Sequence, residues 1–387
     1  MKRVDTLAMI RVYWYHDVVD EVIALARGKK EGTVTSTDVA RLAGVSPASV
    51  TRVFNPDWTM NIRPDIREKV IAAAKELNYT PNAFARILAG NKTNLIAIVL
   101  GQTTGPYYSQ FLLRFIYQLQ RLGKQVLPFT IDEKGDCRAL VEKIRPFRVD
   151  AIVLTSAAYN VNYEPLASDT PIILLELSIN GSGNHSVSSD TYNGGRMVAE
   201  MLVENGHKRI AMISGNALAN QDYDREYGFV NGLHDYGLKL WRKEDASYAR
   251  YGTGCKAARR LLSGNERPDA IFCADDVIAM ATIDVLRYEY SISVPDEISV
   301  VGFHNVQQAS LPPYALTTME SPINRMVDAV VDIILHLDEH KEPVTTVFKM
   351  SPIIRNSMRI TNEKYMRMRE KWIASSKDEV VLNIFQC

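Results

Sequence analysis

Two adjacent carboxylates and one histidine have residue types suited to acid–base chemistry. Asp275 and Asp276 follow one apolar, strand-like run, and His304 follows another. Paired carboxylates can transfer protons, and histidine can act as a base near neutral pH. The sequence places no nucleophile elbow, glycine-rich phosphate loop or metal-ligand spacing beside them. Acidic residues at strand ends commonly cap the next helix, so we expect no catalysis, and an enzyme is only the rival interpretation.

The cysteines give no sign of a metal or redox site. Cys137, Cys255, Cys273 and Cys387 form no CxxC pair, and no histidines stand near them at metal-ligand spacing. This usage is typical of reduced thiols inside the cell. We therefore predict no cofactor.

Composition narrows the class of protein. The 387 residues include 45 Lys and Arg and 45 Asp and Glu, so the formal net charge is zero. A wholly basic nucleic-acid coat is excluded, whereas a small basic module within a neutral chain is not. No apolar run reaches the roughly 18 residues that span a membrane. The first residues do not resemble a secretory signal, so we expect a cytoplasmic protein without a membrane partner.

The region 33–94 reads as short helices. The segment 35–38 is a capping box, in which a hydroxyl acceptor precedes an acid by three residues. Val39, Leu42 and Ala43 then supply an apolar stripe, and Gly44 suits the left-handed conformation at a helix end. These start and stop signals predict a first short helix with those three side chains facing inward.

A second and a third helix follow. Ser46 is a suitable N-cap, and Pro47 occupies the first position of a helix that runs to about Phe54. Two short helices joined by a glycine-containing turn form a helix-turn-helix. The region 33–94 carries eight basic and five acidic residues, which favours a polyanionic partner. The third helix begins near Pro64. Its expected inner stripe is Ile66, Val70, Ile71, Ala74 and Leu77.

After residue 95 the pattern changes to alternating strands and helices. Such alternation predicts parallel sheets covered by helices, and its length predicts two α/β lobes with a ligand crevice between them. The expected strands are 95–100, 125–130, 150–155, 171–176, 209–214, 270–274 and 298–303, and the expected helices include 107–122, 192–205, 223–236, 276–288 and 323–337.

At these motifs the chain resembles the lactose/galactose repressor family of bacterial transcription factors. The matching stretch 35–55 reads TSTDVARLAGVSPASVTRVFN, and further matches lie at 206–210, 225–229, 294–303 and 355–357. The resemblance implies an all-α helix-turn-helix domain followed by an α/β, two-lobed core like that of periplasmic binding proteins, with parallel sheets flanked by helices. It also implies a homodimer, with a tetramer as the alternative, that binds a palindromic double-stranded DNA operator.

The resemblance divides the chain into five parts. They are an unassigned N-terminal extension (1–32), a helix-turn-helix domain (33–81), a hinge helix and linker (82–94), an effector-binding and dimerisation core (95–360) and an unassigned C-terminal tail (361–387).

The resemblance also implies residues that bind DNA. The second helix should enter the major groove. Pro47 and Ala48 match specificity positions that suit a thymine methyl, and Arg52 suits a guanine edge. Leu88 matches a leucine wedged into the minor groove, and Asn82 and Ala85 lie beside it in the hinge. The phosphate or base-edge donors are Thr35, Ser46, Ser49, Thr51 and Asn55.

Six positions match effector contacts of the family. Protonated His304 would carry positive charge, and together with Arg225 it would favour an effector that bears a carboxylate. His304 stands where the family has an aspartate, and its combination with Glu176 resembles the gluconate-type branch. A sugar acid is therefore the effector hypothesis, and a neutral sugar is the alternative. The six positions are Tyr107, Tyr108, Glu176, Arg225, Asp275 and His304.

Other classes of protein remain as alternatives. A transport-type sugar-binding protein would share the core, but the helix-turn-helix and the N-terminal sequence oppose it. An activator would share every motif with a repressor. Binding to a palindromic duplex would separate a regulator from a transport protein and from an enzyme.

Overall fold

The computed structural model describes residues 34–54, 62–79, 93–101, 105–132, 135–156, 169–177, 182–215, 220–247 and 250–361, with 363–364, 366–367 and 370. The chain divides into two compact units, Met1–Lys92 and Thr93–Cys387. In the described part no helix is long and apolar enough to cross a membrane.

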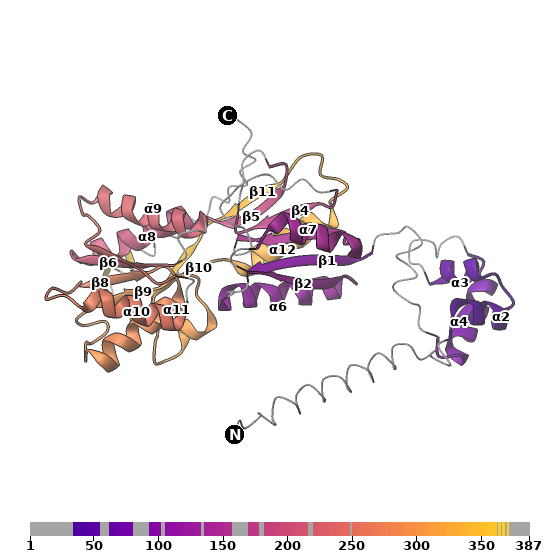
Figure 1. Cartoon of the computed structure of the whole chain (residues 1–387), viewed down its shortest axis with the longest axis horizontal. Coiled ribbons are helices and arrows are strands. Elements are labelled where there is room, and N and C mark those ends of the chain that lie inside the picture. Colours follow the sequence, from indigo (N-terminus) through magenta and orange to yellow (C-terminus); the bar gives the residue numbers. More distant parts are fainter. Residues whose placement is uncertain are drawn as a thin grey trace, which may run out of the picture. The chain divides into compact units, whose positions relative to one another are not determined.

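The first unit is a three-helix cluster (Figure 1). The predicted capping box is confirmed at Thr35, Gly44 ends the first helix with φ +67°, and Ser46 caps the second by accepting from the backbone of Ser49 at 3.2 Å. The helices are α2 (Ser36–Ala43), α3 (Pro47–Val53) and α4 (Pro64–Glu76).

Two predicted core positions of this unit are wrong. Leu42 and Ile71 are each 47% exposed. On α2 the inner face is formed by Val39 and Ala40, and on α4 Ala73 is buried in place of Ile71. Short helices that cross closely bury their small residues, and the bulky neighbours on the adjoining face then stay in solvent.

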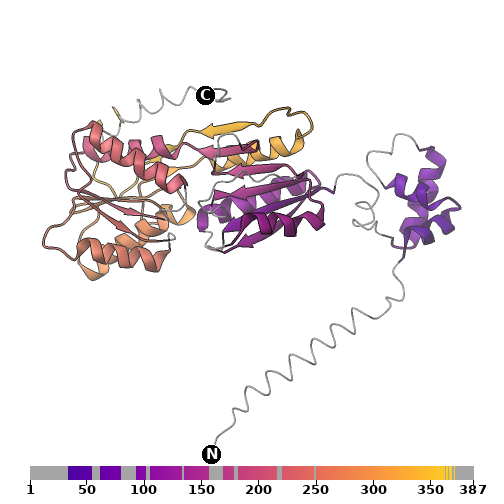
Figure 2. The same cartoon turned by 45° about the horizontal axis from the view of Figure 1, so that its top comes forward.

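The second unit contains two α/β lobes, as predicted (Figures 1 and 2). The first lobe has a parallel six-stranded sheet in the order β11-β5-β4-β3-β1-β2. Its elements are β1 (Leu95–Gly101), α6 (Pro106–Arg121), β2 (Gln125–Ile131), α7 (Cys137–Ile144), η2 (Arg145–Phe147), β3 (Ala151–Thr155), β4 (Ile172–Leu175), β5 (His185–Ser189), α12 (Ile323–Leu335) and β11 (Thr345–Phe348).

Alternation along β1 explains how this sheet is covered on both faces. Ile96 and Ile98 pack in one cluster with Phe111 of α6, whereas Ala97 and Val99 pack in another with residues of α7. Successive side chains of a strand point to opposite faces. A fully apolar run such as 95–100 therefore requires helices on both sides.

The second lobe has a parallel four-stranded sheet in the order β7-β6-β8-β9. In Figure 1, α8 and α9 lie on one face of this sheet and α10 and α11 on the other. Its elements are α8 (Thr191–Glu204), β6 (Ile210–Ser214), α9 (Asn220–Asp235), β7 (Arg242–Asp245), α10 (Tyr251–Leu262), β8 (Ala270–Cys273), α11 (Asp276–Asp284), the π-helical η4 (Val285–Glu289), β9 (Ser299–Val301) and η5 (Gln307–Ser310).

Connections between the lobes complete the unit. The antiparallel pair of β10 (Thr318–Glu320) and β12 (Ser351–Ile353) lies where the chain passes from one lobe to the other. Figures 1 and 2 show these yellow segments between the lobes. The chain therefore crosses from β5 to α8, from β10 to α12 and from β11 to β12, and residues beside these crossings can contact both lobes.

Candidate functional site

Tyr107 and Glu176 form the first-lobe side of the candidate site. Tyr107, at the start of α6, is buried and donates its hydroxyl proton to Oε1 of Glu176. Glu176 is 0% exposed and follows β4 with φ +56°, a left-handed conformation that is uncommon for such a residue. It also accepts from the hydroxyl and the backbone N–H of Ser189, at 2.9 and 2.8 Å. These bonds compensate the buried carboxylate.

His304 forms the second-lobe side. Its ring stacks on Tyr107 with centroids 4.2 Å apart, so side chains of the two lobes meet here. Nε2 of His304 is 3.2 Å from Nη2 of Arg225, and Nδ1 is 3.3 Å from the hydroxyl of Ser321. A guanidinium only donates. Nε2 is therefore the acceptor, and the proton of the neutral ring belongs on Nδ1, where it is donated to Ser321.

Arg225 is the buried cation of the site. It lies on α9, is 2% exposed, donates from Nη1 to the carbonyl oxygen of Ala274, and places Cζ 4.0 Å from the centre of the Phe303 ring. Burial and the charge of Arg225 together lower the pKa of His304 well below its ordinary value. Protonation of His304 is therefore disfavoured in the structure, because a second buried positive charge would lie beside the guanidinium.

The two adjacent aspartates both accept hydrogen bonds at the start of α11. Asp275 caps α11 by accepting from the backbone N–H of Val277 at 2.7 Å. Asp276 is 0% exposed and accepts from Thr318 at 2.6 Å and from the backbone of Val306 at 2.8 Å. Burial and the neighbouring Asp275 raise the pKa of Asp276 to about 8. Within the described ranges no group of three His, Cys, Asp or Glu side chains could hold a metal ion.

The structure therefore brings the predicted effector positions to one place. Tyr107, Glu176, Arg225 and His304 form a continuous chain of contacts. Tyr108 lies edge-on to Tyr107 at 5.1 Å, and Asp275 directly follows the carbonyl that Arg225 binds. Sequence reasoning missed four neighbours, because serine, phenylalanine and methionine carry no distinctive signal. They are Ser189, Phe303, Ser321 and Met326.

Glycines set the position of Arg225. A Cβ on Gly228 of α9 would lie 3.0 Å from the Cα of Tyr192 on α8 and would overlap its carbonyl oxygen. A Cβ on Gly195 of α8 would overlap the carbonyl oxygen of Arg225 itself. The two helices therefore cross with their backbones in contact. The glycine three residues after the arginine is required by this crossing, and Phe229 beside it fills the core.

The predicted reading helix, α3, presents an exposed polar and small-residue face. Pro47, Ala48 and Arg52 are exposed. Among the predicted donors, Thr35 takes part in the capping box, Ser46 is the N-cap beside half-buried Ser49, and the Thr51 hydroxyl donates to the Pro47 carbonyl at 3.2 Å. Four further predicted DNA contacts lie outside the described residues. They are Asn55, Asn82, Ala85 and Leu88.

Two known protein families match separate parts of the chain. Residues 35–82 match bacterial regulatory proteins of the lacI family. Residues 199–358 match the periplasmic binding protein-like domain.

Relatives match nearly their whole length. The chain is 27% identical over 341 residues to the HTH-type transcriptional repressor PurR of Photobacterium profundum, covering 85% of this chain and 99% of that protein. It is 29% identical over 345 residues to the HTH-type transcriptional repressor PurR of Glaesserella parasuis, with the same coverage.

Solved structures agree in fold. The lac repressor dimer bound to operator and the anti-inducer ONPF superposes with a TM-score of 0.76 at 25% identity, covering 84% of this chain and 99% of that one. The complex of the transcriptional regulator CelR with cellobiose gives a TM-score of 0.59 at 27% identity, with the same coverage.

Proposed function

Because this chain belongs to the lacI family of bacterial regulatory proteins and is a DNA-binding repressor rather than an enzyme, we propose that it represses transcription as a homodimer on a palindromic operator. A two-fold dimer carries two equivalent reading helices, and each reads one half-site. The operator-bound dimer of the lac repressor supports this arrangement. The division into a helix-turn-helix domain at 33–81, a hinge at 82–94 and a core at 95–360 is part of the same proposal.

The effector is a sugar acid held between the two lobes. Arg225 carries this proposal: it is a guanidinium 2% exposed at a site where side chains of both lobes meet. A planar guanidinium binds carboxylates with two parallel hydrogen bonds. The sugar hydroxyls would find acceptors in Glu176 and Asp275 and an aromatic face in Tyr107 or Tyr108.

Because His304 is neutral, Arg225 alone would distinguish a carboxylate-bearing effector from a neutral sugar. With Nε2 accepting from Arg225 and Nδ1 donating to Ser321, the imidazole orients the guanidinium and adds no charge. A neutral sugar is the second candidate, supported by the cellobiose complex of CelR, which has the same fold. The two candidates differ in whether affinity requires the positive charge.

Selection of duplexes from a random pool, followed by calorimetry with gluconate and with glucose, tests both parts. We expect a palindrome to be enriched and gluconate to bind more tightly than glucose. The DNA part fails if no duplex is enriched at low salt, where phosphate contacts are strongest. The effector part fails if glucose binds as tightly as gluconate.

A further inference from the structure

A partly buried carboxylate, that of Asp150, holds the first residues of the core. Asp150 accepts from the backbone N–H and the hydroxyl of Thr93, at 2.8 and 3.0 Å, and from the backbone N–H of Asn94 at 3.0 Å. The ammonium of Lys124 is 3.7 Å from the same carboxylate, and the side chains of Lys124 and Asp150 are 10% and 12% exposed. Backbone donors together with a partly buried cation make this a strong, charge-assisted clamp.

The clamp lies where the chain enters the core. The first compact unit ends at Lys92, and the second begins at Thr93. Strand β1 begins only two residues later, at Leu95. The covalent connection between the core and the preceding segment runs through this point. Asp150 thus determines where that segment leaves the core.

Strand β3 joins this clamp to the effector site. Asp150 directly precedes the strand, and Ser156 directly follows it. The hydroxyl of Ser156 contacts the hydroxyl of Tyr108, one of the effector positions. The strand is paired with β1 and β4 along its length, and Thr155 also donates to the carbonyl of Val99 at 2.9 Å. The clamp and the effector position are therefore joined by one hydrogen-bonded strand.

We propose that Asp150, assisted by Lys124, is a positioning residue that couples the effector lobe to the DNA-binding unit. The clamp fixes the residues from which the preceding segment leaves the core, and a fixed point of departure favours the binding of two units to one palindrome. This inference rests on the proposed function. Loss of the clamp lowers the fraction of dimers competent for the palindrome, and the apparent affinity falls by the same fraction.

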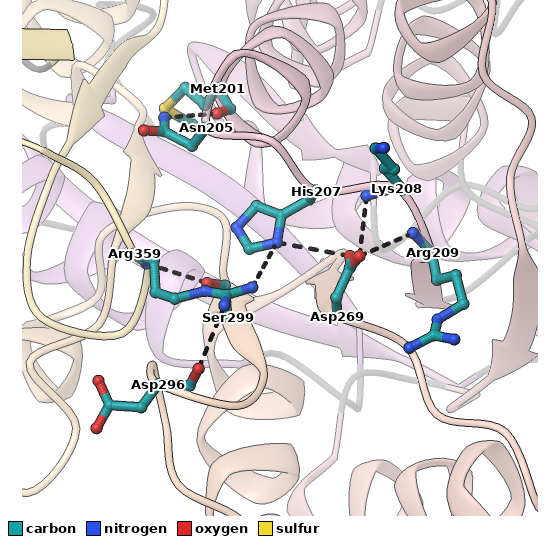
Figure 3. Close-up of polar contacts among 9 residues, drawn as sticks. All are labelled: Met201, Asn205, His207, Lys208, Arg209, Asp269, Asp296, Ser299 and Arg359. Atoms are coloured by element: carbon teal, nitrogen blue, oxygen red, sulfur yellow. Dashed lines mark hydrogen bonds and ion pairs between the residues drawn. The ribbon is translucent and has the colours of Figure 1, made fainter.

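The second lobe contains a matched clamp that leads to no DNA-binding unit (Figure 3). Asp269 directly precedes β8 and accepts from the backbone N–H groups of Lys208 and Arg209, at 2.9 and 3.1 Å, just before β6. Burial alone would raise the pKa of Asp269, but nearby His207, 3.5 Å away, and the hydrogen bonds from those two backbone groups outweigh it and lower the pKa to about 2. In both lobes, therefore, an aspartate that precedes one strand accepts hydrogen bonds from backbone N–H groups just before a neighbouring strand.

The experiment compares Asp150→Ala with Asp269→Ala in the full-length protein. Affinity is measured for the selected palindrome and for a random duplex, together with the melting temperature. We expect Asp150→Ala to weaken palindrome binding by about tenfold or more and to leave random-duplex binding unchanged. Asp269→Ala should cost comparable stability but leave both DNA affinities unchanged. Amide exchange at Thr93 and Asn94 should accelerate only in Asp150→Ala.

A second variant covers the case in which Asp150→Ala does not fold. Lys124→Met removes the cation but keeps the backbone hydrogen bonds of Asp150, and we expect a smaller loss for the palindrome alone. The inference is overturned if the folded Asp150→Ala and Lys124→Met variants bind the palindrome as tightly as the wild type does. It is also overturned if Asp269→Ala loses as much palindrome affinity as Asp150→Ala. If the wild-type protein selects no palindrome, the proposed function fails instead, and accelerated amide exchange would still show the clamp.

Discussion

Replacing Gly228 by alanine should separate helices α8 and α9. The added Cβ would lie 3.0 Å from the Cα of Tyr192, whereas two carbons in contact need nearly 4 Å. The carbonyl oxygen of Tyr192 lies closer still. These atoms are backbone and cannot rotate away, so the helices must move apart by at least about 1 Å. Overpacking of this kind lowers the free energy of unfolding by about 3 kcal/mol at the upper end. The better helix propensity of alanine offsets about 1 kcal/mol of that loss.

The expected net loss is therefore about 2 kcal/mol, or roughly 4–8 °C in melting temperature. The same shift carries Arg225 away from His304, and lengthening their 3.2 Å contact by roughly 1 Å would exceed hydrogen-bond distance. Gluconate affinity should fall with stability.

Gly252→Ala is the matched control for this substitution. Gly252 also lies in a helix, α10, and a Cβ there would meet nothing within 4 Å. Alanine should be neutral or stabilising by up to about 1 kcal/mol, and gluconate binding should not change. Thermal and urea unfolding of both variants provide the assay. If the two variants are equally stable, the close crossing of α8 and α9 does not exist as described.

Three further predictions concern the sites themselves. Arg225→Met should reduce gluconate affinity by about 2–4 kcal/mol and glucose affinity far less by calorimetry; an equal loss for both ligands would remove the carboxylate contact. Arg52→Ala should cost about 1–3 kcal/mol of operator-binding free energy and relax the base preference at one operator position. Lys75→Ala, which removes a charge on α4, should weaken binding to all duplexes alike. An unchanged sequence preference in Arg52→Ala would contradict the role of Arg52. Asp276 binds its proton more tightly in the folded state than in the unfolded state, because its pKa is raised from 3.8 to about 8. Its contribution to the free energy of unfolding is therefore complete below about pH 4. That contribution is lost as the pH rises through 8, by up to about 1.4 kcal/mol per pH unit. Asp276→Asn should flatten that slope in urea unfolding; an unchanged slope would place the titration elsewhere.

Helix ends and central strands could be predicted because their signals are local. The capping box at Thr35, the left-handed Gly44 and the proline after Ser46 each specify a backbone conformation by themselves. The apolar runs of the central strands likewise identify positions buried on both faces. The strand 185–189 was not predicted because it is mostly serine and lacks an apolar pattern, although four of its five residues are buried. The edge strand 242–245 was not predicted because its four residues are charged and none of them is buried.

The residues that form the candidate site could be predicted from the sequence, but their charge states could not. Resemblance to a family located Arg225 and His304, but only the structure shows them 3.2 Å apart and buried together, which keeps the histidine neutral. The exposure of Leu42 and Ile71 also depends on how three helices cross. Charge states and crossing geometry are properties of the assembled fold and have no local sequence signature.

Titration of the selected palindrome with the full-length protein, with and without gluconate, measures operator binding and effector control in one experiment. Fluorescence anisotropy with a half-site duplex as reference should show two chains on each palindrome, much weaker binding to the half-site, and an affinity changed by at least about fivefold when gluconate is added. Binding of one chain with equal affinity for both duplexes, unaffected by any sugar or sugar acid, would contradict the account.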